Sequence, residues 1–449
     1  MRNQCVLAQA ATGFGKTAVG SFMIQSAVTK GKRTFFVVHR KELIEQTSKT
    51  FDRLGIEHGI IQSGKTYYPY LNVNICSIDT LKKRLDKVEP PDFIIFDEAH
   101  HTGSKGWALV HAWAKEAGAF IIGLSATPWR LDRKGLDMYF DTMVKGPSVK
   151  WLIANGYLSQ YKAYSLNVPD MSGVSTKQGD WDVSEVEAIM KDSALYGCAI
   201  DNWKRLANGK KTIAFAPTIE TSKELAQMFR DEGIKAAHLD GSTPSWERRS
   251  IIADFADGRV DIISNVGLFG EGFDLSAIAG RDVPIEAVIL YRPTQSLSLH
   301  LQQVGRALRP KAQAAIILDH AGNCLRHGLP DGEYEWTLGA RKKKKSESEQ
   351  TIRVRECPKC HHCFEPTDVC PNCGHVFETK QVERDFYDGD LKELTQEAID
   401  AVKKQKKAEL IAARTFEQLV ELGTSRKYKH PEYWAKHILE GRSKWRSKK

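Results

Sequence analysis

The octapeptide Ala10-Ala11-Thr12-Gly13-Phe14-Gly15-Lys16-Thr17 lies between an apolar run, Val6-Leu7-Ala8, and a stretch that reads as a helix from about Ala18. Small residues and glycines at such a turn let successive backbone N–H groups point at one spot, where they and the helix N-terminus bind triphosphate oxygens. We therefore expect a phosphate loop here. Lys16 would reach the β- and γ-phosphates of ATP, and the Thr17 hydroxyl would bind the bridging Mg²⁺. The alternative is a turn that only joins strand to helix, because Ala10 stands where the phosphate-loop pattern has glycine.

The length and composition of the chain indicate a multidomain globular protein. With 449 residues, 41% of them hydrophobic, it can bury two domain-sized cores and still have a tail left over. No stretch approaches the roughly 20 apolar residues that span a bilayer, and no signal-peptide pattern is visible. We expect a soluble intracellular protein with no membrane partner. Five of the nine cysteines crowd between Cys357 and Cys373, which favours reduced thiols and one metal site over a secreted disulfide scaffold.

The first 150 residues alternate short apolar runs with polar, helix-like stretches. Continuous apolar runs that alternate with helices predict a parallel sheet covered on both faces. Ligands of such sheets lie beyond the carboxyl ends of the strands, which is where the phosphate loop follows the first run. The runs are Val6–Ala10, Thr34–His39, Val73–Ile78, Phe93–Phe96 and Phe120–Leu124.

Two polar clusters follow the fourth and fifth runs. In Asp97-Glu98-Ala99-His100, Asp97 would hold the Mg²⁺ directly or through water, and Glu98 would orient and deprotonate the water that attacks the γ-phosphate. An acidic pair that only interacts with a helix N-terminus is the alternative. In Ser125-Ala126-Thr127-Pro128, two hydroxyls could sense the neighbouring carboxylates, although such a tetrapeptide could also be an ordinary turn.

These segments resemble, in order, four motifs of the superfamily II helicases and translocases. Gly13 to Thr17 resembles motif I, His39-Arg40-Lys41-Glu42-Leu43 motif Ia, Asp97 to His100 a DEAH-type motif II, and Ser125-Ala126-Thr127 motif III. The resemblance implies that His100, Ser125 and Thr127 couple hydrolysis to movement. It also implies a second RecA-like domain that ends in arginine fingers.

The second half of the chain contains apolar runs for such a domain. They predict a second α/β core after a transition zone of mixed polar residues. Within it, Gly270-Glu271-Gly272-Phe273-Asp274 resembles motif V, and the segment from Gln302 to Arg309 resembles motif VI. The runs are Thr212–Ala216, Lys235–Leu239, Val260–Val266, Glu286–Tyr291 and Ala314–Asp319.

Two arginines of the motif VI segment are candidates for catalysis. Arg306 and Arg309 are three residues apart, which predicts that both lie on one side of a helix. Guanidinium groups directed at the γ-phosphate neutralise charge in phosphoryl transfer, an effect worth roughly 10³–10⁵ in rate. An ordinary surface helix could also carry two arginines.

The resemblance implies a cycle in which ATP bridges the two domains. Lys16 and Asp97 would hold ATP from one side, with Gly272, Asp274, Gln302, Arg306 and Arg309 on the other. Opening and closing would then move two nucleic-acid grips relative to each other. The implied grips contact the nucleic-acid backbone without reading bases. They are His39, Arg40, Lys41, Ser77, Thr80, Thr218, Gly241, Ser242 and Thr243, although Arg40 and Lys41 could equally be solvated loop charges.

Adenine recognition is a departure from the family pattern. Helicases of this group carry an adenine-recognising glutamine upstream of motif I, whereas Gln4 and Gln9 here belong to no recognisable motif. Relaxed nucleotide choice and a start site inside a longer reading frame both explain the difference.

The chain beyond residue 340 carries most of the net charge of +9. Residues 341–449 contain 25 Lys and Arg against 18 Asp and Glu, beginning with the run at 341–345. A polyanionic partner such as nucleic acid, or a solvated linker, explains this excess. Two C-x-x-C pairs follow and offer four thiolates for a tetrahedral Zn²⁺. The ligands would be Cys357, Cys360, Cys370 and Cys373, with Cys363 as a spare.

The last 70 residues have apolar positions at helical spacing, and Gly423 reads as a helix stop. Tyr433, Trp434 and Trp445 are interleaved with basic residues, a pattern that suits base stacking with phosphate contacts. A small core helix with a charged face explains the same residues equally well.

The expected architecture is α/β, with two tandem RecA-like domains, a small zinc ribbon and a helical C-terminal tail. The expected boundaries are 1–150 for the first domain, 151–210 for a transition, 211–340 for the second domain, 341–379 for the linker and ribbon, and 380–449 for the tail. We expect a cytoplasmic bacterial or phage ATPase that translocates on DNA and separates or remodels strands. The alternatives are an RNA helicase, a double-strand translocase serving a nuclease partner, and a zinc-ribbon binding module whose affinity ATP switches.

Overall fold

The computed structural model describes residues 4–340, apart from 131–133, 166–170, 172–173, 178–179, 193–194 and 270–274, and it describes residues 354–377. Further along, the described residues are 404, 408–410, 412–425, 431–432, 434–436 and 438–439. The chain divides into two compact units, residues 1–379 and residues 380–449. Among the described residues, no helix is both long and apolar enough to cross a membrane.

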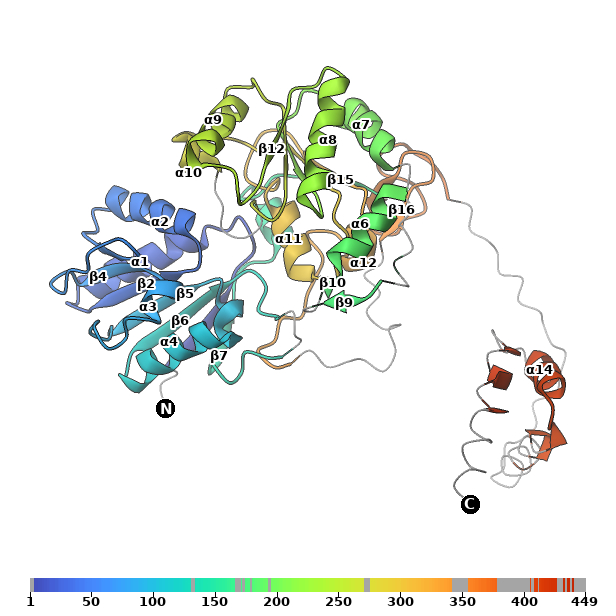
Figure 1. The fold of residues 1–449 in the computed structure, drawn as a ribbon, viewed down its shortest axis with the longest axis horizontal. Helices are drawn as coiled ribbons and strands as arrows, with labels where there is room; N and C mark the ends of the chain where they lie inside the picture. Colours follow the sequence, from blue (N-terminus) through green and yellow to red (C-terminus); the bar gives the residue numbers. More distant parts are fainter. Residues whose placement is uncertain are drawn as a thin grey trace. The chain divides into compact units, whose positions relative to one another are not determined.

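A sheet of seven parallel strands forms the first domain (Figure 1). Its strand order is β3-β4-β2-β5-β6-β1-β7. The strands are β1 (Cys5–Gln9), β2 (Thr34–Val38), β3 (Gly59–Ile61), β4 (Val73–Ser77), β5 (Phe93–Asp97), β6 (Phe120–Ser125) and β7 (Thr142–Lys145). The helices are α1 (Lys16–Val28), α2 (Lys41–Arg53), α3 (Ile78–Leu81), the 3₁₀ helix η1 (Ala99–Gly103) and α4 (Lys105–Glu116). Five strands match the predicted apolar runs to within one residue.

Both faces of this sheet are buried, which explains why its strands are apolar without alternation. In β2, Phe35 and Val37 belong to one core cluster, whereas Phe36 and Val38 belong to the cluster on the opposite face. All four side chains are fully buried. The predicted parallel sheet with two covered faces is therefore confirmed.

The second domain has six parallel strands in the order β12-β13-β11-β14-β15-β8. The strands are β8 (Tyr161–Ser165), β11 (Thr212–Phe215), β12 (Ala236–Leu239), β13 (Ile262–Asn265), β14 (Ala287–Leu290) and β15 (Ala315–Asp319). The helices between residues 149 and 327 are α5 (Val149–Ala154), α6 (Val183–Asp192), α7 (Leu195–Leu206), α8 (Ile219–Asp231), α9 (Ser245–Ala256), α10 (Leu275–Ala279), α11 (Leu297–Gly305) and α12 (Asn323–His327). A two-stranded hairpin pairs β9 (Thr176–Lys177) with β10 (Asp180–Trp181).

The stretch 151–210, which we expected to be a transition segment, contributes a strand to the second sheet. Strand β8 pairs in parallel with β15 over five residues, from Tyr161 with Ala315 to Ser165 with Asp319. Strand β8 precedes β15 by about 150 residues in the sequence. No local periodicity therefore identifies β8 as part of the second domain.

The cysteine-rich segment extends the same sheet. Strands β16 (Arg355–Glu356) and β17 (His362–Phe364) form an antiparallel hairpin, and β17 pairs in antiparallel fashion with β8. The backbone N–H of Ser165 also donates to the carbonyl oxygen of His361 at 3.0 Å. The cysteine-rich segment is thus joined to the edge of the second domain by backbone hydrogen bonds.

The C-terminal unit has a small apolar core of its own. Helix α14 (Phe416–Ser425) buries Leu419 beside Ala413 and Ala435. Trp434 packs against this core, which favours the core-helix interpretation for that residue, whereas Tyr433 and Trp445 lie outside the described residues. The predicted helix stop at Gly423 is wrong. The helix continues through Gly423 to Ser425. Glycine at this position allows Pro431 to pack closely against the helix, because a Cβ there would lie 2.9 Å from Cβ of Pro431.

Candidate functional site

The phosphate loop lies at the carboxyl end of β1, between β6 and β7. Gly13 and Gly15 have φ angles of 88° and 89°, in the left-handed region that favours glycine. Gly15 is the N-cap of α1, so the helix begins at Lys16 and directs its N-terminal N–H groups toward the loop. The local structure is that of a phosphate-binding turn from Thr12 to Thr17.

The acidic pair lies at the end of β5, next to β6 in the same sheet. Asp97 and Glu98 are 5% and 6% exposed, so both carboxyl groups are removed from water. Burial, together with the charge of Glu98, raises the pKa of Asp97 to about 6, although the charges of Lys16 and His39 act in the opposite direction. A buried acidic pair of this kind fits a divalent cation, which would keep both groups ionised; Asp97 and Thr17 would hold the Mg²⁺.

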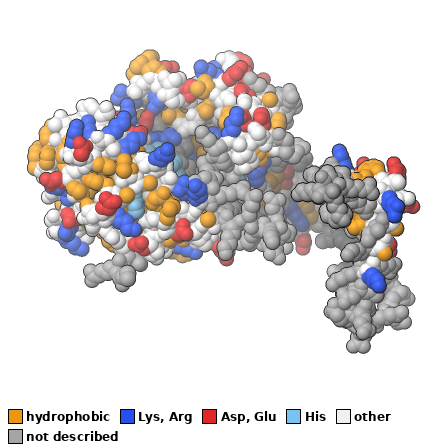
Figure 2. Space-filling view, turned by 60° about the horizontal axis from the view of Figure 1, so that its bottom comes forward, with side chains coloured by type: hydrophobic (Ala, Val, Ile, Leu, Met, Phe, Trp, Pro, Cys, Tyr) orange, Lys and Arg blue, Asp and Glu red, His pale blue; other side chains and the backbone are white. Residues whose placement is uncertain are grey.

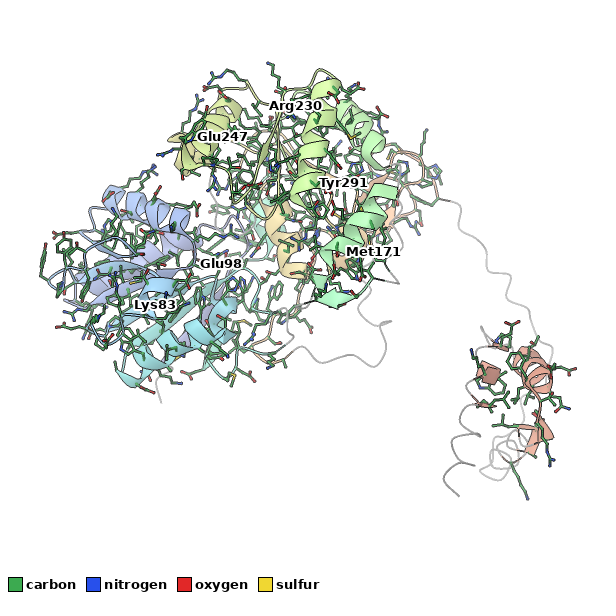
Figure 3. The ribbon with its side chains drawn as sticks, in the orientation of Figure 1. Lys83, Glu98, Met171, Arg230, Glu247 and Tyr291 are labelled. Carbon is green, nitrogen blue, oxygen red and sulfur yellow. The ribbon has the colours of Figure 1, made fainter. Side chains whose placement is uncertain are left out.

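Glu98 has a backbone conformation that few residues other than glycine adopt. Its φ and ψ are 52° and 52°, in the left-handed region. Such a conformation costs about 1–3 kcal/mol and persists where the surrounding structure requires it, which is common at active sites. In Figure 3, Glu98 lies on the side of the first domain that faces α11. This position suits the proposed role of Glu98 toward an attacking water.

A chain of polar contacts leads from Glu98 to the second domain. His100 Nδ1 lies 3.4 Å from Glu98 Oε2 and 3.3 Å from Ser125 Oγ. Ser125 Oγ donates to the carbonyl oxygen of Thr127 at 2.9 Å and accepts from its backbone N–H at 3.2 Å. Thr127 Oγ1 then lies 2.5 Å from Ser298 Oγ, on α11. The three predicted coupling residues therefore lie in one network.

Ser298 is a member of this network that sequence reasoning missed. It belongs to the first turn of α11, whose N-cap Ser296 accepts a hydrogen bond from the backbone N–H of Leu299. A serine at the start of a helix has an ordinary capping explanation, so nothing in the sequence distinguishes Ser298 from its neighbours. Its partner in the first domain is separated from it by 171 positions.

The motif VI segment packs directly on the phosphate loop. A Cβ built on Gly305 would lie 2.6 Å from Thr12 Cγ2, so only glycine fits at this contact without a shift. Thr12 Oγ1 and the amide nitrogen of Gln302 are buried and have no hydrogen-bond partner among the described residues. Buried polar atoms without partners are rare in proteins, and a bound nucleotide or water would satisfy these two.

The expected helical placement of Arg306 and Arg309 is wrong. Helix α11 ends at Gly305, Arg306 is its C-cap residue, and the backbone continues in tight turns with Ala307 N–H bonded to the Val304 carbonyl. Arg306 is nevertheless 7% exposed and follows the glycine that contacts Thr12. The end of α11 thus places the motif VI segment beside the phosphate loop. Gly272 and Asp274 of the predicted motif V lie outside the described residues.

A cavity of about 240 Å³ lies at the junction of the two domains. Its lining is mostly apolar and comes from the ends of β1 and β6, from α11, and from residues 330–336. Thr12, Thr127 and Gly305 line it, which places it beside the phosphate loop and the coupling network.

The predicted nucleic-acid grip of the first domain contacts the second domain. Arg40 donates to the carbonyl oxygens of Gly267 and Leu268 at 3.4 and 3.2 Å. Next to it, Glu42 on α2 forms an ion pair of 2.8 Å with Arg248 on α9. Lys41 is exposed. Figure 2 shows Lys and Arg side chains interspersed with hydrophobic and acidic ones on one face of the molecule.

Other predicted grip residues have structural partners. Thr218 caps α8 by accepting from the backbone N–H of Thr221, and its hydroxyl donates to Glu187. The backbone N–H and hydroxyl of Ser242 both donate to Asp240.

The remaining grip residues differ in exposure. Gly241 is exposed, Thr80 is buried, and Ser77 is the N-cap of α3 without a side-chain cap bond. The ring of His39 lies 5.3 Å from that of His101. Nucleic-acid contact by any of these residues stays a prediction.

Four cysteines in the β16–β17 segment are arranged as a metal site. The sulfur atoms of Cys357, Cys360, Cys370 and Cys373 all lie within 4.8 Å of one another. The pairs Cys357–Cys373 and Cys360–Cys370 are 3.6 and 3.7 Å apart. Tetrahedral Zn²⁺ with bonds of about 2.3 Å requires sulfurs about 3.8 Å apart. The four thiolates therefore fit Zn²⁺.

Cys363 is not part of this cluster. It alternates with His362 and Phe364 along β17, so its side chain points to the opposite face. Phe364 packs against the cysteine cluster, whereas Cys363 is buried in the core of the second domain. Burial raises the pKa of the Cys363 thiol far above its ordinary value.

Two family matches cover the two domains. Residues 1–130 match the family described as type III restriction enzyme, res subunit, and residues 191–311 match the helicase conserved C-terminal domain. A 51.5 kDa protein of Lactococcus phage (isolate 7-9) is 34% identical over 356 residues, which cover 78% of this chain and 74% of the phage protein.

Two more distant similarities involve proteins that are longer than this chain. The putative ATP-dependent helicase IRC3 of Saccharomyces cerevisiae is 28% identical over 319 residues, which cover 67% of this chain but 45% of the yeast protein. A solved structure, the ATP-dependent type ISP restriction-modification enzyme LlaBIII bound to DNA, has a TM-score of 0.51 at 17% identity and covers 70% of this chain and 26% of that one. This last likeness concerns the fold alone.

Proposed function

We propose that this chain, which belongs to superfamily II of the helicases and hydrolyses ATP, couples hydrolysis to movement on DNA and to the separation or remodelling of its strands. The observation that carries the proposal is the junction of the two domains. There, Gly305 contacts Thr12 of the phosphate loop and Ser298 contacts Thr127. A nucleotide bound at the loop would therefore meet groups from both domains.

Different residues at this junction would have different roles in ATP hydrolysis. Lys16 and the loop N–H groups would bind the phosphates, and Glu98 would accept the proton of the attacking water. Arg306 and Arg309 would stabilise the charge that develops on the γ-phosphate. Mg²⁺ held by Asp97 and Thr17 would neutralise the phosphate oxygens when bound. The change in charge at the γ-phosphate after hydrolysis would then alter the interactions of both domains with the nucleotide.

DNA is the proposed substrate because of the family that the first domain matches. This is the family of the res subunit of type III restriction enzymes. The junction also carries basic side chains suited to phosphate contacts, including Arg40 and Lys41. The zinc ribbon and the basic segment at 341–345 would add contacts or attach a partner such as a nuclease.

The test compares ATP hydrolysis in the presence of single-stranded DNA, duplex DNA and RNA, followed by unwinding of forks with opposite tails. Stimulation by single-stranded DNA with displacement of a strand supports the proposal. Stimulation by duplex DNA without displacement identifies the second candidate, a double-strand translocase, which the restriction-enzyme match favours. Stimulation by RNA alone contradicts the DNA assignment. Glu98→Gln is the control: it should bind ATP but lose hydrolysis.

A further inference from the structure

The segment that follows α12 returns from the second domain to the first. Leu329 belongs to the apolar core of the second domain. Nine residues later, Leu338 packs against the apolar core of the first domain. We call residues 329–340 the strap, because both of its ends are anchored and the part between them crosses the junction.

The second-domain end of the strap is held by polar contacts. The Tyr334 hydroxyl donates to the carbonyl oxygen of His327 at 3.2 Å. The hydroxyl of Tyr161, on β8, donates to the carboxylate of Asp331. These contacts fix the start of the strap to the sheet and to α12.

The first-domain end is fitted closely around a glycine. The backbone N–H of Leu136, a fully buried residue, donates to the Leu338 carbonyl oxygen at 2.6 Å. A Cβ on Gly135 would lie 2.6 Å from the Ala340 nitrogen and 2.7 Å from the Leu338 oxygen. Both of these are backbone atoms, so the strap would have to move to admit even one methyl group.

The middle of the strap contacts the coupling network. The ring of Trp336 lies 4.6 Å from that of Trp129 and 5.1 Å from that of Tyr334. Trp129 is two residues beyond Thr127, which reaches Ser298 of the second domain. Tyr334 and Trp336 also line the junction cavity together with Thr127.

We propose that the strap positions the loop after Thr127 against α11, with Trp336 as the positioning residue. Aromatic contacts of this kind stabilise a structure beyond the area they bury, and a tether with two anchored ends keeps the domains within reach of each other. The strap thereby makes the Thr127–Ser298 contact available in each cycle. This inference rests on the proposed function for its activity readout, and its structural readout is independent of that function.

The structural test is hydrogen exchange at the Leu136 amide in the full chain. Gly135→Ala should speed this exchange by about tenfold, because the added methyl displaces the accepting carbonyl. Gly339→Ala is the matched control within the strap, since a Cβ there meets no atom within 4 Å. Unchanged exchange in Gly135→Ala would overturn the placement of the strap whether or not the protein is a helicase.

The functional test compares hydrolysis with and without nucleic acid. Gly135→Ala and Trp336→Ala should each lower nucleic-acid-stimulated hydrolysis roughly fivefold, the loss expected for about 1 kcal/mol of positioning, and leave the basal rate unchanged. Trp336→Phe should recover most of the stimulation, because an aromatic ring is retained. Equal losses of basal and stimulated rates would contradict a positioning role. Absent stimulation in the unmodified chain would instead contradict the proposed function.

Discussion

Thr127 Oγ1 and Ser298 Oγ lie 2.5 Å apart, although one belongs to the first domain and the other to α11 of the second. Through Ser125 and His100, this contact continues to Glu98. A shift of α11 would therefore disturb Thr127, which three successive polar contacts link through Ser125 and His100 to Glu98, the group assigned to activate water. Under the proposed function, this network would couple ATP hydrolysis to movement of the two domains.

Loss of the Ser298 hydroxyl should uncouple the two domains. Ser298→Ala leaves Thr127 with no partner at this point, which costs about 1 kcal/mol and should lower stimulated hydrolysis roughly fivefold. Ser298→Thr keeps the hydroxyl and should retain most of the activity. Thr127→Ala combined with Ser298→Ala should be no worse than either alone; additive losses measured by steady-state ATPase assays would argue against a shared contact.

A methyl group on Gly305 should impair closure of the junction. In Gly305→Ala, the added Cβ would press on Thr12, and overpacking of this kind costs about 1–3 kcal/mol. We expect weaker nucleotide binding, measured by displacement of a fluorescent ATP analogue, with thermal unfolding close to that of the parent. Gly339→Ala serves again as a substitution into open space. Nucleotide affinity equal to that of the parent would contradict the contact.

The ion pair between Glu42 and Arg248 offers a charge-reversal test of the opposite side of the junction. The Arg248 side chain is 13% exposed and that of Glu42 is 36% exposed, so screening by solvent is partial. Glu42→Arg and Arg248→Glu should each reduce stimulated hydrolysis by roughly twofold to fivefold. The doubly reversed variant should recover activity, and failure to recover would mean that the two side chains act separately.

Removal of zinc should destabilise the second domain as well as the ribbon. Cys370→Ser breaks the four-thiolate set and should reduce bound zinc, measured by atomic absorption, from one ion per chain to near zero. The melting transition should also fall, because β17 is hydrogen-bonded to β8. Cys363→Ser is the control: it should keep its zinc, since this thiol lies in the core of the second domain. Retained zinc in Cys370→Ser would refute the site.

Local patterns were sufficient to predict the strands that carry the site. The apolar runs Val6–Ala10, Phe93–Phe96 and Phe120–Leu124 correspond to strands packed against helices on both faces, so each has a strong signal that depends on few neighbours. Because parallel strands end at one edge, the polar residues that follow them were expected to gather there. The phosphate loop, the acidic pair and the coupling hydroxyls do lie at that edge.

Features that depend on distant partners could not be predicted. Strand β8 becomes part of the second sheet only through β15, and Cys363 is distinguished from the zinc ligands only by the core it faces. The helix at Arg306 was predicted from spacing alone, whereas α11 ends at Gly305, the residue that contacts Thr12 of the distant phosphate loop. The strap has no periodic pattern, because its residues pack against two different domains.

The hairpin that carries the cysteines has a consequence for how the chain completes its fold. Outward-facing N–H and C=O groups of β8 are paired by β17, so a chain that stops before residue 364 leaves them open to a strand from another molecule. Fragments trimmed to the two domains alone would be expected to associate edge to edge, and a metal that holds the β16–β17 hairpin in place would protect this edge from aggregation.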